Sequence, residues 1–161
     1  MVWNDGLVQF DTRPAAYAVI IRDGEVLLSH WSLKGYTSWT LPGGGIEVGE
    51  SPAECCRREV FEETGYHVEV GPLIEVGHRW IAPDERITPN GDRALLTIQF
   101  IHTAEIISGE LVCEVDGTTD DVRWVPLGEL DEYARADGWP TAAIERALRY
   151  GGDGSASPGG H

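Results

Sequence analysis

Three glutamates within five positions are the residues of this chain best placed to do chemistry: Glu59, Glu62 and Glu63. On a helix, at about 100° per residue, their side chains share an arc of roughly 100°. Like charges at such spacing destabilise a helix by about 0.2–0.5 kcal/mol per pair. A divalent cation reverses that effect, because Mg2+ binds carboxylate oxygens and shares phosphate oxygens with a substrate. The spacing therefore predicts a helical platform for a metal ion and a pyrophosphate.

The element that must position these carboxylates is a helix, which we predict from Pro52 to about Thr64. Ser51 is a favourable N-cap, and proline suits the first helical position. Glu54 follows Ser51 by three residues, which completes a capping box. Gly65 supplies the left-handed conformation that ends a helix. A neighbouring arc of this helix can face a core, and it comprises Ala53, Cys56, Val60 and Thr64.

Three consecutive glycines, Gly43–Gly45, follow Pro42 shortly before this helix. Glycines let the backbone approach a ligand closely, and they leave a carbonyl free to point at a metal ion. A plain turn is the alternative interpretation of the same residues.

Together these residues resemble the Nudix box, G-x5-E-x7-R-E-U-x-E-E-x-G-U, in which U is a bulky aliphatic residue. The box begins at Gly44, and every fixed position matches except the last, where Tyr66 replaces an aliphatic residue. That departure concerns packing below the helix. The resemblance extends more loosely over residues 12–149. It implies an α/β fold, an α/β/α sandwich with a mixed central sheet.

The resemblance also implies a reaction, in which water attacks one phosphorus of a nucleoside diphosphate linked to another group. Glu62 and Glu63 match positions that bind metal, with the Gly44 carbonyl beside them. Glu59 matches the position that contacts metal, or orients or deprotonates the water. The implied cofactor is Mg2+, with Mn2+ as the other possible ion.

Arg58 and Glu50 complete the set of catalytic candidates. Arg58 matches the arginine that holds a catalytic glutamate through a bidentate pair, and Glu50 is expected to pair with Arg58. An ordinary salt bridge at the helix cap is the alternative for this pair.

A further acid outside the box is expected to complete the site. Asp120 and Asp121 precede the apolar run 122–125, where relatives commonly carry one. Glu114 and Asp116 are the next candidates. The alternative is that these acids are solvated turn residues.

Substrate contacts are less specifically indicated. Trp39 and Trp80 could stack on a base, although such tryptophans are more often packing residues. Arg79, Arg86 and Arg93 could reach phosphates from a predicted long loop, although each arginine alone is more often solvated.

Two classes of substrate and one different class of function stay open. The substrate is an NDP-sugar or ADP-ribose type compound, or a nucleoside triphosphate, including oxidised ones, in a housecleaning role. The other class is a non-catalytic domain that senses a nucleotide. The complete set of box carboxylates disfavours it.

The composition of the 161 residues indicates one globular domain that can bury a core. A net charge of −15 argues against a nucleic acid polymer or an anionic membrane as partner. The three cysteines do not suggest a disulfide framework, which favours a reducing cytoplasm. We expect no signal peptide and no membrane helix. A homodimer is possible by analogy with relatives.

In chain order we expect an N-terminal arm (1–11), the Nudix domain (12–150) and a flexible tail (151–161). Strands are predicted at 15–22, 26–30, 94–105 and 122–125, with two strand pieces within 67–76. Residues 32–38 and 77–93 are predicted as loops, and residues 127–135 as a helix. A last helix is predicted at 140–149, with Ala143, Ala147 and Leu148 facing inward.

Overall fold

The computed structural model describes residues 9–113, 117–135 and 137–152. Its strands are β1 (Phe10–Val19), β2 (Ile21–Arg22), β3 (Glu25–Leu33), β4 (Tyr36–Thr40), β5 (Gly43–Gly45), β6 (Tyr66–Ile81), β7 (Ala94–Gly109) and β8 (Thr119–Pro126). Its helices are α1 (Pro52–Thr64) and α2 (Thr141–Gly152), with two 3-10 segments, η1 (Pro83–Glu85) and η2 (Leu127–Glu132). The tail predicted at 151–161 lies outside the described residues from residue 153 onward.

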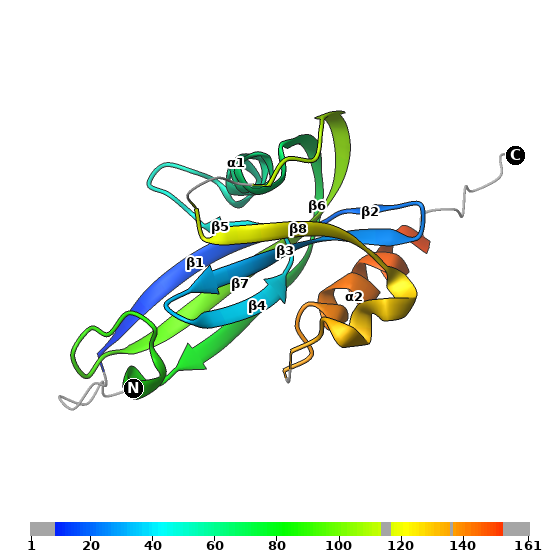
Figure 1. The fold of residues 1–161 in the computed structure, drawn as a ribbon. Coiled ribbons are helices and arrows are strands. Elements are labelled where there is room, and N and C mark those ends of the chain that lie inside the picture. Colours follow the sequence, from blue (N-terminus) through cyan, green and yellow to red (C-terminus); the bar gives the residue numbers. More distant parts are fainter. Residues whose placement is uncertain (1–8, 114–116, 136, 153–161) are drawn as a thin grey trace, which may run out of the picture.

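Two sheets form the centre of the molecule. One has the order β5-β1-β7-β6, in which β1 and β7 run parallel and the other pairs run antiparallel. In the other sheet, β3 pairs with β2, β4 and β8, all antiparallel. Figure 1 shows α1 and α2 on opposite sides of these sheets. The predicted α/β/α sandwich with a mixed sheet is therefore confirmed.

Each helix packs on its own half of the core. Cys56 and Val60 of α1 join a buried cluster with Ala18 of β1, whereas the next strand residue, Val19, belongs to the cluster that α2 covers. Successive side chains of a strand point to opposite faces, so this division follows from the period of two.

Both predicted caps of α1 are present. The Ser51 hydroxyl accepts a hydrogen bond from the Glu54 N–H at 3.3 Å, and the Glu54 carboxylate accepts one from the Ser51 N–H at 2.8 Å. Gly65 is left-handed, with a φ of 76°. Ser51 and Gly65 therefore fix where the helix begins and ends, and with it the phase of the glutamates.

The C-terminal helix has a different phase from the one predicted. Ala143 and Ala147 are buried as expected, but Leu148 is 43% exposed and Ile144 is fully buried. At about 100° per residue, positions 143, 144 and 147 fall within one arc, and position 148 lies outside it. The segment predicted as a helix at 127–135 is the 3-10 segment η2.

Three connections also differ from prediction. Strand β1 begins at Phe10, five residues before the strand predicted at 15–22, because it pairs with β7 from there onward. Residues 32–38 are not a loop but part of the β3–β4 hairpin. Its turn residues Lys34 and Gly35 both have positive φ, as a two-residue hairpin turn requires. Strand β6 continues to Ile81, so the predicted long loop contracts to residues 82–93.

No described helix has the length and apolar character that a membrane crossing requires.

Candidate active site

The glycine run forms a strand that lies between β1 and helix α1. Gly43–Gly45 pair with residues 15–17 of β1, so the plain turn is the wrong interpretation. A Cβ on Gly43 would lie 2.2 Å from the Ala16 carbonyl oxygen, and one on Gly44 would lie 2.5 Å from the Glu59 carboxylate. At Gly43 the clash is with the main chain, so no side chain fits there, whereas at Gly44 a side chain would have to displace the Glu59 carboxylate. The glycines therefore allow the backbone to approach Glu59 closely, and the close approach to a ligand stays a prediction.

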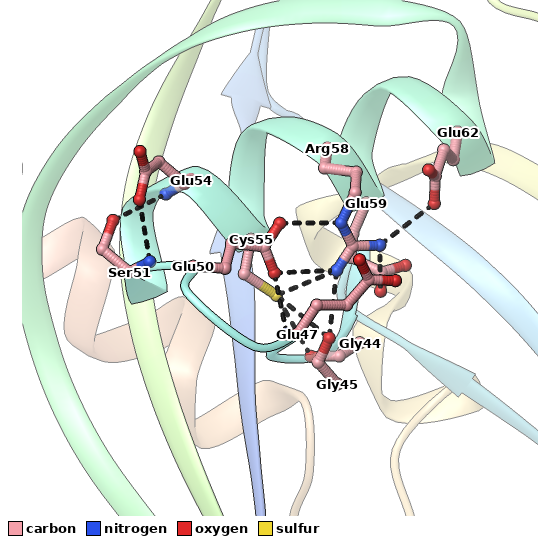
Figure 2. A network of polar contacts seen from close by, with 10 residues as sticks. All are labelled: Gly44, Gly45, Glu47, Glu50, Ser51, Glu54, Cys55, Arg58, Glu59 and Glu62. Atoms are coloured by element: carbon pink, nitrogen blue, oxygen red, sulfur yellow. Dashed lines mark hydrogen bonds and ion pairs between the residues drawn. The ribbon is translucent and has the colours of Figure 1, made fainter.

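Arg58 is the centre of the polar network on α1 (Figure 2). Its Nε and Nη2 donate to the two carboxylate oxygens of Glu50, at 2.7 and 3.0 Å. Its Nη1 donates to Glu59 at 2.9 Å and to Glu62 at 3.2 Å. Nη2 also donates to the Gly45 carbonyl at 3.0 Å. The guanidinium thus joins three of the predicted carboxylates to the glycine strand.

The Arg58–Glu50 pair keeps both groups charged. Hydrogen bonds from Arg58, and a weaker one from the Glu47 N–H, lower the pKa of Glu50 to about 2. The same pair raises the pKa of Arg58 above its ordinary value. At neutral pH, Arg58 therefore stays a fixed cation that Glu59 and Glu62 both face.

Glu63 points away from this network and into the interior. Its side chain accepts hydrogen bonds from the Ser29 hydroxyl at 3.0 Å, the Thr119 hydroxyl at 3.0 Å and the Gly43 N–H at 3.2 Å. The residue is only 6% exposed, and burial raises its pKa to about 8. Glu63 thus ties α1 to β3 and β8, whereas Glu59 and Glu62 lie together at Arg58.

The fit of this site to a divalent cation rests on two carboxylates and a main-chain oxygen. In the described part of the chain, no three His, Cys, Asp or Glu side chains converge closely enough to hold a metal ion. Glu59 and Glu62 share one nitrogen of Arg58, and Gly44 lies against Glu59. Such oxygen donors are the ligands that Mg2+ prefers, and Mg2+ keeps several waters. The donor set therefore fits Mg2+ with few protein ligands.

The predicted extra acids lie on β8 and are engaged elsewhere. Asp120 contacts Nδ1 of His30, and Asp121 accepts a hydrogen bond from Nε of Arg123 at 2.7 Å. Neither contact involves the Arg58 network. The other two candidates, Glu114 and Asp116, lie outside the described residues.

Trp39, a candidate for base stacking, is surrounded by neighbours. Its ring lies 5.0 Å from that of His30 and 5.2 Å from that of Tyr133, measured between centroids. The Arg123 guanidinium lies over the Trp39 ring at 5.0 Å. A base that stacks on the face under Arg123 would have to displace that guanidinium.

Arg79 and Trp80 are adjacent on β6, and their side chains have different neighbours. Arg79 Nη1 lies 3.9 Å from the Asp137 carboxylate. The Trp80 ring contacts that of Phe10 edge-on at 4.9 Å. None of these contacts involves Trp39, so the three predicted substrate residues do not form one cluster.

Two further arginine candidates anchor a loop. Arg86 and Arg93 both donate to the Asp11 carboxylate, at 2.8 and 2.5 Å, and Asn90 donates to it at 2.7 Å. These hydrogen bonds hold the pKa of Asp11 well below its ordinary value, and the hydrogen bond from Asn90 has the largest effect. They tie residues 82–93 to β1 and are not directed at α1.

Sequence reasoning did not identify three residues that shape the site. Ser29 and Thr119 are buried polar residues on strands, a pattern that could have indicated a buried partner such as Glu63. The Cys55 thiol donates to the Gly44 and Gly45 carbonyls, with sulfur–oxygen distances of 3.4 and 3.5 Å. Nothing in the sequence separates Cys55 from an ordinary helix-packing residue.

Comparisons with known proteins place this chain in a family. A profile of the NUDIX domain matches residues 11–146. The phosphatase NudJ of Escherichia coli K12 is 30% identical over 115 residues, which make up 70% of this chain and 67% of that protein.

Solved structures share the fold. A NUDIX hydrolase from Nitrosomonas europaea has a TM-score of 0.69 and 22% identity, covering 89% of this chain and 90% of its own. An ADP-ribose pyrophosphatase from Streptococcus suis has a TM-score of 0.61 and 21% identity, and the match covers 86% of this chain and 91% of that protein. Because the family profile spans most of the chain and includes the whole box, this chain belongs to the Nudix family of hydrolases.

Proposed function

We propose that this hydrolase cleaves the pyrophosphate linkage of a nucleoside diphosphate derivative, of the NDP-sugar or ADP-ribose type, with the help of Mg2+. The observation that supports this is the convergence of Glu59 and Glu62 on one nitrogen of Arg58, beside the glycine strand. Water adds to one phosphorus, the bridging P–O bond breaks, and two products leave, each with a phosphate.

Arg58 and Glu50 act as the rigid base of the site. The bidentate pair holds the guanidinium in place, so Nη1 keeps both glutamates oriented toward the substrate. Glu59 orients the attacking water or takes its proton. Glu62 is 46% exposed, which suits a carboxylate that meets a ligand arriving from solvent.

The Gly44 carbonyl, Glu59 and Glu62 would hold the metal ion, with Mn2+ as the other possible ion. Nudix hydrolases generally use divalent metal ions. Bound Mg2+ would polarise the phosphate oxygens and offset the charge that develops on them. Glu63 remains a candidate ligand, and it would have to leave its hydrogen bonds to Ser29 and Thr119.

For the extra acid and for the substrate contacts, we propose several candidate residues. Asp120 or Asp121 would complete the site by leaving its present partner, His30 or Arg123. Trp39, Arg79 and Trp80 are the candidates for contacts with the base and the second phosphate-linked group.

Two other activities compete with this proposal. Nucleoside triphosphates, including oxidised ones, would be cleaved to a monophosphate and pyrophosphate. The Escherichia coli relative is named a phosphatase, so release of a terminal phosphate is a further outcome to test. A domain that only senses nucleotides would bind without cleavage.

A product analysis decides between these activities. The purified chain is incubated with ADP-ribose, UDP-sugars and nucleoside triphosphates, with Mg2+, with Mn2+ and with a chelator, and products are separated by ion-exchange chromatography. We expect AMP and ribose phosphate from ADP-ribose, or UMP and sugar phosphate from a UDP-sugar, only with metal present. Pyrophosphate or inorganic phosphate as the main product would assign a rival activity. No cleavage of any phosphoanhydride would contradict enzymatic function.

A further inference from the structure

The outer edge of β6 is the longest sheet edge of this fold. The strand runs for 16 residues and pairs with β7 along one side. Along its other side, no strand of the described chain is hydrogen-bonded to it. Figure 1 shows the far ends of β1, β7 and β6 extending beyond both helices. Outward main-chain N–H and C=O groups on such an edge form a template for another strand.

The side chains along this edge do not protect it. Leu73, Val76 and Trp80 are exposed by 46%, 55% and 53%. The bulges of β6 end at Glu75, and residues 75–81 beyond them contain no lysine and no proline, the residues that usually prevent pairing at an edge. An edge of this length with exposed apolar residues is typical of a strand-pairing surface.

The sequence of this segment is complementary to itself. If two copies pair antiparallel about Gly77, Glu75 of each copy lies opposite Arg79 of the other. This register uses residues 75–79, which lie beyond the bulge between Leu73 and Glu75 and pair regularly with β7. Opposite charges in directly facing positions stabilise a strand pair, and the two-fold axis makes this charge pair twice. Along a strand, every second residue points its N–H and C=O groups outward. Residues 75, 77 and 79 are two positions apart, so the groups that face each other across the two-fold axis can form hydrogen bonds.

The present contacts of these charges leave room for the second copy. Arg79 is 52% exposed and lies 3.9 Å from its intramolecular partner, Asp137. Glu75 is held at 3.0 Å by Arg146 of α2, which fixes the carboxylate on the same face of β6 that Arg79 occupies. Arg79 can therefore reach Glu75 of a neighbouring strand without losing a close ion pair.

We propose that this chain forms a homodimer in which two copies of β6 pair antiparallel along residues 75–79, with Gly77 on the two-fold axis. The pairing joins the two mixed sheets into one continuous sheet. It leaves α1 and its glutamates outside the interface, whereas Arg79, a proposed substrate contact, lies within it. The inference does not require the proposed reaction, because its tests measure assembly alone.

A charge-swap series tests the interface by sedimentation velocity over a range of concentrations. We expect a dimer for the unmodified chain and a shift to monomer for R79E, which places like charges opposite each other twice. The double variant E75R/R79E restores opposite charges and should restore the dimer. The control R149E makes the same charge change on an exposed position of α2 and should stay dimeric. A monomeric unmodified chain, or a dimer that R79E does not weaken, would overturn the proposal.

A cross-link tests the register without relying on charge. In a C113S background, we expect G77C to form an intermolecular disulfide under mild oxidation, because directly facing Cα atoms lie about 4.5–5.5 Å apart. A Cβ at Gly77 meets only the side chain of Gln99, whose amide oxygen lies 3.2 Å away, so this flexible side chain has to shift slightly to accept the cysteine. The matched variant R79C should not cross-link, because its two copies would be about 13 Å apart. Equal cross-linking of both variants would contradict this register.

Discussion

At the scale of single residues, one arginine determines where the carboxylates of α1 point. Arg58 contacts Glu50, Glu59 and Glu62 through three different nitrogens and leaves Glu63 to the interior. Four glutamates that look equivalent in the motif thus divide into one that anchors the arginine, two that lie together at its Nη1 and are the proposed metal ligands, and one that is buried.

Replacement of Glu62 by glutamine tests the ligand side of this division. Glutamine keeps the size and a hydrogen-bonding oxygen for Arg58 but loses the charge that a metal ion needs. We expect E62Q to lower turnover at least ~100-fold, as for the loss of electrostatic stabilisation of a transition state. The melting temperature should change little because Glu62 is half-exposed. The control E69Q removes an exposed glutamate of β6 and should keep full turnover. Unchanged turnover in E62Q would remove Glu62 from the site.

The buried glutamate makes stability depend on pH. Burial raises the pKa of Glu63 to about 8 in the folded chain, above its ordinary value of 4.5. Between these two values the folded state binds a proton that the unfolded state has lost, so the free energy of unfolding falls as pH rises. We expect the urea midpoint to decrease from pH 5 to pH 8, and E63Q to flatten this decrease. Parallel pH profiles for the two proteins would mean that another group is responsible.

At the scale of elements, the C-terminal stop of α1 is more tightly constrained than its sequence signal suggests. Gly65 is left-handed, and a Cβ there would lie 2.4 Å from the Glu110 carbonyl oxygen. Gly49 is also left-handed, with a φ of 86°, but a Cβ there meets nothing within 4 Å. Comparison of the two glycines therefore separates backbone strain from a clash with a neighbouring chain segment.

We expect G65A to destabilise the fold more than G49A. Alanine at a positive φ costs more than about 1 kcal/mol in either position, and the clash with the Glu110 backbone adds to this only at Gly65. Chemical unfolding of both variants measures the difference. Equal losses would show that the segment at Glu110 moves aside readily.

Local sequence signals predicted helix α1, whereas the bounds of the strands depend on the strands they pair with. Ser51, Glu54 and Gly65 act within a few residues, so the helix could be read from the sequence to its ends. The start of β1 at Phe10 depends on β7, more than eighty residues later, and no local pattern reports such a partner. The β3–β4 hairpin was missed because lysine rarely adopts the left-handed conformation that Lys34 takes.

In the site, too, contacts within one segment could be predicted from the sequence, whereas contacts between distant segments could not. The motif spacing predicted the Arg58–Glu50 pair because both residues belong to one cap-and-helix segment. The environment of Glu63 could not be predicted, since Ser29 and Thr119 come from strands on either side of it in the sequence. The contacts of Asp120 and Asp121 with His30 and Arg123 likewise depend on how β8 pairs with β3.

At the scale of the whole molecule, charge opposes the proposed substrate. The chain has a net charge of −15, and a nucleotide with a pyrophosphate is also an anion. Like charges slow the encounter of enzyme and substrate, and added salt screens this repulsion over about 10 Å at 0.1 M. Electrostatic steering usually accelerates the association of enzyme and substrate, whereas the net charge of this chain slows it.

The expected outcome is a rise in kcat/KM as a monovalent salt is added from low ionic strength at a constant concentration of Mg2+. Turnover at saturating substrate should change much less, because encounter no longer limits the rate. A substrate of lower charge, such as a dinucleotide with a diphosphate bridge, should show a smaller rise than a triphosphate, which separates screening from a general effect of salt on the fold. A fall in kcat/KM with salt would mean that arginines near the site outweigh the net charge. Single replacements of Arg79 and Arg123, the exposed arginines nearest to the substrate candidates, would then identify the residue responsible.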